Sequence, residues 1–230
     1  MKTDNIKAII FDFMGVLLFQ KSDYSPDPLV DEIDDAIGKV TDDSVFEKQT
    51  CEKFHLSKDQ FNNILDKVVW KYESYKPLWE LLPLLRKTYK LAILNNGTGL
   101  TLPKLKAKFD VETKFDLFVS SAKEGIKKPS PEIYLLTARK LGVCPEECLF
   151  MDDSYENVEG AKSAGMKTLW WEREKNREEI FKEFVGLCTG GRLPPMSQSV
   201  SRLKRINISH KLNIVKCQSE YSRFRINWQL

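Results

Sequence analysis

The sequence predicts an α/β fold, with a doubly wound parallel sheet as the core and an α-helical domain inserted near its start. Five short apolar runs alternate with segments of helical periodicity, as expected for parallel strands buried on both faces. Shortly after the first run, residues 27–75 carry three helical patterns and no strand pattern. With 42% hydrophobic residues among 230, the chain can bury the core of one domain with a large insertion.

The predicted strands and core helices follow one another along the chain. The strands cover 6–11, 91–94, 117–119, 148–151 and 168–171. Core helices are predicted over 78–89, 131–141 and 154–164. The second of these helices has Pro131 in its first turn and ends before Gly142, whereas Pro83 inside the first should kink or restart it.

The insertion is predicted to form helices near 28–40, 43–55 and 57–75. Ser57 is a suitable N-cap for the last of them. The insertion leaves the first strand at the sheet edge where α/β proteins bind ligands, so we interpret it as a lid over an active site. A structural satellite bundle is the alternative. The expected domains are a core at 1–16 and 77–185, a helical cap at 17–76 and a basic, weakly ordered tail at 186–230.

The net charge of +3 is unevenly distributed. Residues 1–185 carry 28 Lys and Arg against 32 Asp and Glu, a net −4, whereas 186–230 carry 8 against a single Glu, a net +7. The body is therefore mildly acidic, which argues against a nucleic-acid-binding protein. Only the tail could bind nucleic acid, and a poorly packed extension is the alternative for it.

Other classes are disfavoured by composition. No run of about 18 apolar residues occurs, so no membrane-spanning helix or membrane partner is expected. The N-terminal apolar run is short and is interrupted by Asp12, unlike a secretory signal. Five cysteines without a CxxC pair favour neither disulfides nor a zinc site and indicate a cytoplasmic protein. His55 and His210, the only histidines, have no motif-like surroundings, which disfavours Ser-His-Asp and Cys-His enzymes.

Carboxylates follow two of the predicted strands. Asp12 ends the first strand and is followed by Gly15, which permits a tight turn. Asp152 and Asp153 end another strand, and adjacent carboxylates are unfavourable unless a cation or a helix N-terminus compensates them. Such hard oxygen ligands suit Mg²⁺. Helix capping by Asp153 or Ser154 is the alternative, and the two roles can coexist.

A pair of lysines precedes the helix that begins near Pro131. Lys127 and Lys128 stand directly before Pro129. A lysine that enters an anionic site can neutralise a phosphate group. The alternative for a lysine pair is a solvated surface.

Four motifs in this order resemble the haloacid dehalogenase (HAD) superfamily, in the subfamily with a helical cap inserted after the first strand. The motifs are IIFDFMGVL, LAILNNG, IKKPSPEIY and LFMDDSYENVEGAKSAGM. The resemblance extends over 6–185 and leaves the tail outside it. It implies a HAD-like core, a helical cap and Mg²⁺-dependent phosphoryl transfer.

The resemblance also assigns roles to residues around the metal. It implies that Asp12 attacks phosphorus and forms an aspartyl-phosphate. Mg²⁺ would be held by Asp12, the backbone carbonyl of Met14 and Asp153. Asp152 would assist directly or from the outer shell.

On the substrate side, the resemblance implies that Lys128 offsets the negative charge of the phosphate and of the nucleophile. Asn95 stands where family members usually have a phosphate-binding Ser or Thr, and Asn96 follows it. The amide of Asn95 can still donate a hydrogen bond to phosphate.

Met14 is the larger departure from the family pattern, because phosphatases of the family usually have a second Asp there that protonates the leaving oxygen. A methionine can neither donate nor accept that proton, and such help is typically worth about 10²–10⁴ in rate. Alkyl phosphates should suffer most and acyl or aryl phosphates least. We expect a phosphohydrolase of a small phosphorylated metabolite. A catalytically silent binding or regulatory protein is the alternative, and a 2-haloacid dehalogenase is less favoured because the Asp152–Asp153 pair suits a metal.

Overall fold

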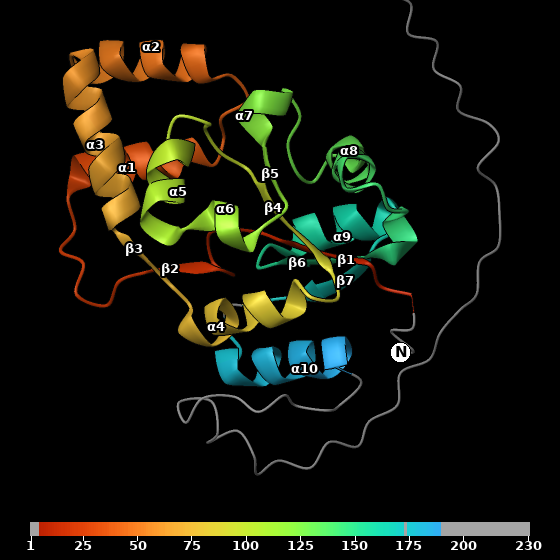
Figure 1. Cartoon of the computed structure of the whole chain (residues 1–230). Helices are drawn as coiled ribbons and strands as arrows, with labels where there is room; N and C mark the ends of the chain where they lie inside the picture. Colours follow the sequence, from red (N-terminus) through yellow and green to blue (C-terminus); the bar gives the residue numbers. More distant parts are fainter. Residues whose placement is uncertain (1–4, 173, 190–230) are drawn as a thin grey trace, which may run out of the picture.

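The computed structural model describes residues 5–172 and 174–189, and a five-stranded parallel sheet forms its centre (Figure 1). The strands are β1 (Ala8–Phe11), β4 (Lys90–Asn95), β5 (Leu117–Ser120), β6 (Cys148–Asp152) and β7 (Lys167–Trp170). Each coincides with one of the five predicted apolar runs. The α/β fold class and the helical insertion are thus confirmed.

The strand order β5-β4-β1-β6-β7 places β1 at the centre. Ile9 pairs with Leu91 of β4 on one side and with Leu149 of β6 on the other. The chain first builds β4 and β5 on one side of β1 and then returns to add β6 and β7 on the other. Such a reversal of direction opens a crevice at the carboxyl ends of the central strands, where open α/β sheets bind ligands.

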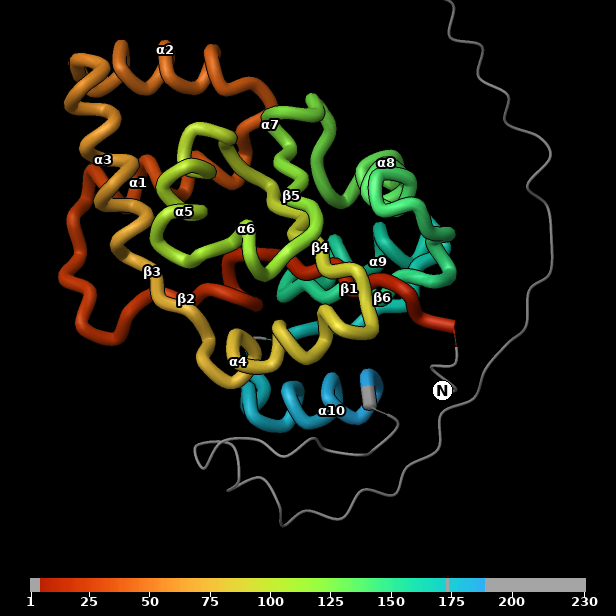
Figure 2. Tube along the Cα trace, in the orientation of Figure 1, coloured from red at the N-terminus to blue at the C-terminus, as the bar shows by residue number. Residues whose placement is uncertain are grey.

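Alternating side chains of the strands pack on the two faces of the sheet. Ile9 and Phe11 point to the face covered by α4 (Lys76–Leu85) and α10 (Arg177–Thr189), whereas Ala8 and Ile10 point to the face covered by α8 (Pro131–Leu141) and α9 (Tyr155–Ser163). Helices α4 and α10 are far apart in sequence and lie side by side in both views (Figures 1 and 2). The remaining short elements of the core are α5 (Leu102–Phe109), α6 (Val111–Lys114), α7 (Ser121–Glu124) and the 3₁₀ turn η1 (Pro145–Glu147).

The insertion forms three helices with a small core of their own. They are α1 (Pro28–Ile37), α2 (Asp43–Phe54) and α3 (Lys58–Trp70). Asp27, Asp42 and Ser57 cap them by accepting hydrogen bonds from first-turn backbone N–H groups. Apolar side chains such as Ile33 and Phe61 then pack between the helices. This helical body lies beside the carboxyl ends of the strands (Figure 1).

The expectation of no strand within 27–75 is wrong. The third insertion helix ends at Trp70, and β3 (Tyr72–Ser74) pairs antiparallel with β2 (Leu18–Gln20), so that a two-stranded ribbon joins the insertion to the core. The paired residues Leu18 and Ser74 are 56 positions apart. Three-residue strands with such distant partners leave no periodic pattern in the local sequence.

Two predicted boundaries also differ from the structure. Helix α4 continues through Pro83 and ends two residues later, at Leu85, so the proline stands in the last turn and close to the end of the helix. Helix α10 extends to Thr189, so the predicted tail boundary at 186 falls inside a helix. The rest of the predicted tail lies outside the described residues. None of the helices formed by the described residues is long and apolar enough to cross a membrane.

Candidate active site

The carboxyl ends of the three central strands bring Asp12, Asn95 and Asp152 to one edge of the sheet, because β4 and β6 flank β1. A cavity of about 330 Å³ lies between this edge and the insertion. Its core side is lined by Asp12, Met14, Asn95, Asn96, Lys128, Asp153, Ser154 and Asn157, and its other side by residues of α1, α3 and β3. All the predicted site residues except Asp152 line this cavity, and Asp152 lies directly behind it, in contact with Lys128.

Lys128 lies between two of the carboxylates. Its Nζ is 2.6 Å from Oδ1 of Asp12 and 2.7 Å from Oδ2 of Asp152. The lysine is only 2% exposed and Asp152 is fully buried. One ammonium group thus neutralises part of the negative charge of the two carboxylates, which stand at the ends of neighbouring strands.

A third carboxylate joins this cluster. Oxygen atoms of Asp12, Asp152 and Asp153 lie within 4.8 Å of one another. A Cβ atom on Gly15 would come within 2.1 Å of Oδ2 of Asp153, so the glycine provides the space that this carboxylate occupies. Gly15 also has a φ of +90°, which glycine adopts without strain. Three carboxylates beside one lysine leave an excess of negative charge, and their hard oxygen atoms fit Mg²⁺.

Burial perturbs the ionisation of this cluster. Burial raises the pKa of Asp12 to about 7; the Lys128 ammonium opposes that shift, and the carboxylates of Asp152 and Asp153 add to it. Burial alone would lower the pKa of Lys128, but the two carboxylates that it contacts outweigh burial and raise it. The lysine is therefore charged at neutral pH. A further cation near Asp12 would favour its ionised form.

Asp152 is held by a network that the sequence analysis missed. Nδ2 of Asn157 lies 3.1 Å from each of its carboxylate oxygens, and the backbone N–H of Ser154 donates to Oδ1 at 2.8 Å. Together with Lys128, these donors engage both oxygens of Asp152. A signal for Asn157 was present, because it follows Asp152 by five positions and falls in the first turn of α9.

The two asparagines after β4 have different surroundings. Nδ2 of Asn96 donates to the carbonyl of Lys128, and its Oδ1 accepts from the backbone N–H of the same lysine, both at 2.9 Å. Asn95 is 6% exposed and lines the cavity. Its side-chain amide makes no hydrogen bond with any of the described residues, so it is available to a bound ligand.

Comparison with known proteins agrees with this geometry. The haloacid dehalogenase-like hydrolase family matches residues 6–165, which is more than half of the chain. The chain belongs to this family. The predicted HAD resemblance is therefore confirmed.

The chain is similar to two curated relatives and to one solved HAD structure. It is 31% identical over 134 residues to glyceraldehyde 3-phosphate phosphatase of Pyrococcus furiosus, a match that covers 57% of this chain and 54% of that protein. It is 27% identical over 117 residues to (S)-2-haloacid dehalogenase 2 of Pseudomonas sp. (strain CBS-3), covering 49% and 51%. The chain thus spans about half the length of these relatives. A HAD family enzyme from Bacteroides thetaiotaomicron, solved in complex with magnesium and inorganic phosphate, shares the fold with a TM-score of 0.59 at 20% identity, over 76% of this chain and 99% of that one.

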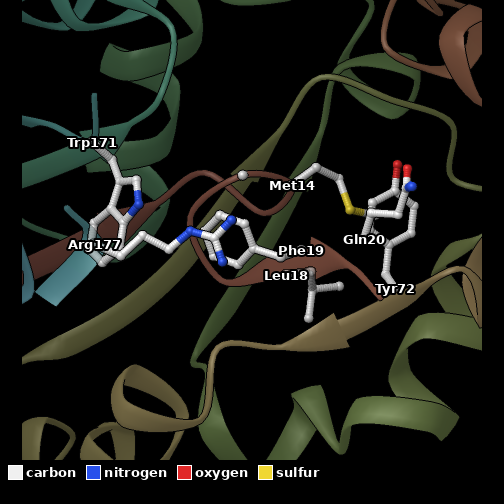
Figure 3. Close-up of a pocket in the computed structure, with 8 residues that line it drawn as sticks. Met14, Leu18, Phe19, Gln20, Tyr72, Trp171 and Arg177 are labelled. Atoms are coloured by element: carbon white, nitrogen blue, oxygen red, sulfur yellow. The ribbon is translucent and has the colours of Figure 1, made fainter. Parts of the chain in front are cut away.

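Met14 lies at the boundary between the cavity of this HAD-like chain and a second pocket. Met14 and Tyr72 line both, and the second pocket, of about 320 Å³, continues toward Trp171 and Arg177. Figure 3 shows the Met14 side chain extending toward Gln20 and Tyr72. A thioether in this position can neither protonate a leaving group nor activate water.

Several contacts tie the insertion to the HAD-like core, and two groups of them lie at the ends of insertion helices. The carboxylate of Asp43, at the start of α2, accepts a hydrogen bond from the backbone N–H of Gly99 at 2.9 Å. Nζ of Lys108, on α5, donates to the carbonyls of Val69 and Tyr72 at 2.9 and 2.7 Å, where α3 gives way to β3. These contacts hold the helical body over the carboxylate cluster.

Proposed function

We propose that this chain is a Mg²⁺-dependent phosphohydrolase that acts on a small phosphorylated metabolite. The observation that carries the proposal is the convergence of Asp12, Asp152 and Asp153 within 4.8 Å, beside a buried lysine and at the end of a cavity. Its support from relatives is the phosphatase activity in the name of the Pyrococcus protein and the magnesium and phosphate bound by the Bacteroides enzyme.

Asp12 is the nucleophile in this proposal. Its ionised carboxylate attacks phosphorus, the bond from phosphorus to the ester oxygen breaks, and an aspartyl-phosphate forms. Water then hydrolyses this acyl phosphate and restores the carboxylate. Lys128 favours the ionised form of Asp12 and offsets the charge of the incoming phosphate, since its ammonium lies 2.6 Å from the nucleophile.

The donor set for the cation is Asp12, Asp153 and the carbonyl of Met14. Asp152 acts from the outer shell, because both its oxygens already accept hydrogen bonds from protein donors. A bound Mg²⁺ supplies positive charge that favours the ionised nucleophile and neutralises the phosphate oxygens.

Other residues position the substrate and the lysine. The free amide of Asn95 donates to a phosphate oxygen. Asn96 is a positioning residue, because it fixes the backbone of Lys128 at both its N–H and its carbonyl. The segment 17–76 serves as the cap and the segments 1–16 and 77–185 as the core, so that the cap excludes bulk water from the phosphate.

The test is phosphate release from aryl, acyl and sugar phosphates with and without Mg²⁺. We expect release that requires Mg²⁺, is fastest for aryl and acyl phosphates, and disappears in Asp12→Asn. Asp23→Asn is the matched control, because Asp23 is exposed and outside both pockets. Release that persists in Asp12→Asn would contradict the assignment of the nucleophile.

Met14 favours one other candidate, a catalytically silent HAD-like binding protein. In that case the folded chain releases phosphate from none of the substrates, yet still binds Mg²⁺ together with BeF₃⁻, an analogue of the phosphoryl group. Halide release from a 2-haloacid without a metal would instead indicate a dehalogenase. Three clustered carboxylates disfavour that reaction, because its substrate carries a carboxylate of its own.

A further inference from the structure

The cap side of the cavity is acidic. Helix α1 contributes Asp34 and Asp35 to its lining, opposite Asp12 and Asp153 of the core. Lys128 is the cation of this lining, so four carboxylates face one ammonium, a formal net charge of −3 when all are ionised. That ammonium is already committed to Asp12 and Asp152.

Asp34 is held in place by the cap itself. Its Oδ2 lies 2.7 Å from Nζ of Lys71 and accepts a hydrogen bond from the hydroxyl of Tyr72 at 2.6 Å. Lys71 is buried and also pairs with Asp31 at 2.8 Å, so one ammonium is shared by two carboxylates. Lys71 therefore leaves no positive charge over for a ligand.

Asp35, the next residue, is different. It is exposed, lines the cavity, and makes no ion pair or hydrogen bond with the residues that the structure describes. Its carboxylate can therefore accept hydrogen bonds from a ligand, and it repels an anion.

A second observation, on the core side, is a side-chain amide that is available to a ligand in this cavity. Asn95 on the core side is 94% buried, counted from its 6% exposure, and its amide lacks a partner among the described residues while it lines the same cavity. None of the described residues has a buried side-chain polar atom without a partner, so the polar atoms of this amide reach the cavity, where a ligand can bond to them. A substrate would then place its phosphate at the core end of the cavity and its other end against the carboxylates of the cap.

We propose that Asp35 makes this cavity selective for phosphate monoesters whose leaving group carries hydroxyl or ammonium hydrogen-bond donors and no second anionic group. The inference rests on the proposed phosphohydrolase function and names its substrate class. Asp35 is the specificity-determining residue, and Asp34, fixed by Lys71 and Tyr72, is the second acceptor beside it.

Another cation lies nearby and provides the strongest alternative. Arg177 lines the second pocket, on the far side of Met14 and Tyr72, with its guanidinium 3.9 Å from the ring centroid of Phe19 (Figure 3). Met14 and Tyr72 stand between the two pockets, so a long substrate with an anionic end would have to extend past them to reach this guanidinium. The experiment therefore includes this residue.

The test compares two pairs of substrates that differ only at the far end. In the first pair, the hydroxymethyl group of glycerol 3-phosphate is replaced by a carboxylate in 3-phosphoglycerate. In the second pair, the aminomethyl group of phosphoethanolamine is replaced by a carboxylate in 2-phosphoglycolate. Phosphate release by the full chain with Mg²⁺ gives kcat/KM for each. We expect the hydroxyl and ammonium substrates to be preferred by about tenfold or more, which corresponds to about 1.4 kcal/mol.

Asp35→Asn should reduce this preference by about threefold or more, mainly through KM, and Asp35→Lys should reduce it further. Asp23→Asn changes the net charge equally and should leave the preference unchanged. The preference should also weaken as KCl is raised, because exposed charges are screened. If the role of Asp35 were purely structural, Asp35→Asn would change neither the preference within each pair nor the dependence of that preference on salt.

The outcomes separate this inference from the proposed function. Equal rates on both members of each pair, or an unchanged preference in Asp35→Asn, overturn the inference while the phosphohydrolase stands. Good activity on the carboxylated substrates that is lost in Arg177→Met also overturns it, in favour of the second pocket. Absence of Mg²⁺-dependent release from every monoester, aryl phosphates included, overturns the function and the inference together.

Discussion

Replacement of Gly160 by alanine should move Lys128, the proposed catalytic lysine, without touching it. Gly160 lies within α9, where it packs against the backbone that follows Lys128. A Cβ atom there would lie 2.4 Å from the carbonyl oxygen of Pro129 and 2.9 Å from its Cβ. Since Cβ atoms essentially never approach a neighbour within 3.0 Å, the segment at Pro129 and α9 must move apart by at least about 0.6 Å.

The shift is transmitted to Lys128, which is covalently bonded to Pro129 and whose Nζ lies 2.6 Å from Asp12 and 2.7 Å from Asp152. A displacement of about 1 Å at a reacting group can cost about 10²-fold in rate. We therefore expect Gly160→Ala to lower kcat/KM for an aryl phosphate by about tenfold to a hundredfold. Overpacking should cost about 1–3 kcal/mol of stability.

Gly186→Ala is the matched control. Gly186 also lies inside a helix, α10, and a Cβ there would meet no atom of the described residues within 4 Å. Both substitutions gain up to about 1 kcal/mol of helix propensity, so the difference between the two variants isolates the contact with Pro129. Urea unfolding measures the stabilities and phosphate release the rates. If Gly160→Ala matches Gly186→Ala in both, the close packing of α9 does not position the lysine.

Three further results are expected. Met14→Asp should raise kcat on alkyl phosphates by about tenfold or more and change aryl phosphates less, because an acid is restored for the poorer leaving group; equal effects on both classes would show that position 14 does not face the leaving oxygen. Since burial raises the pKa of Asp12 to about 7, Mg²⁺ must displace a proton, and calorimetry should show weaker binding at pH 6 than at pH 8, with proton release. Mg²⁺ binding that does not depend on pH would contradict the raised pKa of Asp12. Without Mg²⁺, the native chain holds this proton more tightly than the unfolded chain, so the stabilising contribution of Asp12 is full below pH 3.8 and is lost as the pH rises to about 7. Asn96→Ala should lower kcat by about tenfold with a smaller change in KM, because Lys128 loses both backbone contacts; a change in KM alone would indicate contact with the substrate instead.

The core of the fold could be predicted because its signals are local. A parallel strand buried on both faces is a continuous apolar run, and each run from 6–11 to 168–171 became a strand. Helix α8 has the predicted bounds, since Pro131 and Gly142 mark its ends within the sequence itself. The ribbon of β2 and β3 could not be predicted, because its three-residue strands acquire their hydrogen bonds only from distant partners.

The candidate site divides in the same way. Asp12 and the Asp152–Asp153 pair could be selected because carboxylates at strand ends are visible in the sequence, and strand order brings them together. The engagement of Asn96 with the lysine backbone was not visible, since it depends on how the loop before α8 lies against the end of β4. Asn157 was overlooked although its spacing from Asp152 places it in the first turn of a helix.

By itself, the sequence determined the five strands of the central sheet, most of the longer helices, and which chemical groups stand at the strand ends, because burial and periodicity are properties of neighbouring residues. Only the tertiary structure decided what surrounds those groups. The placement of Asp34 and Asp35 opposite Asp12, and the burial of Lys128 between Asp12 and Asp152, follow from packing between segments that are far apart in the chain. Such packing sets distances and charges that no local pattern encodes.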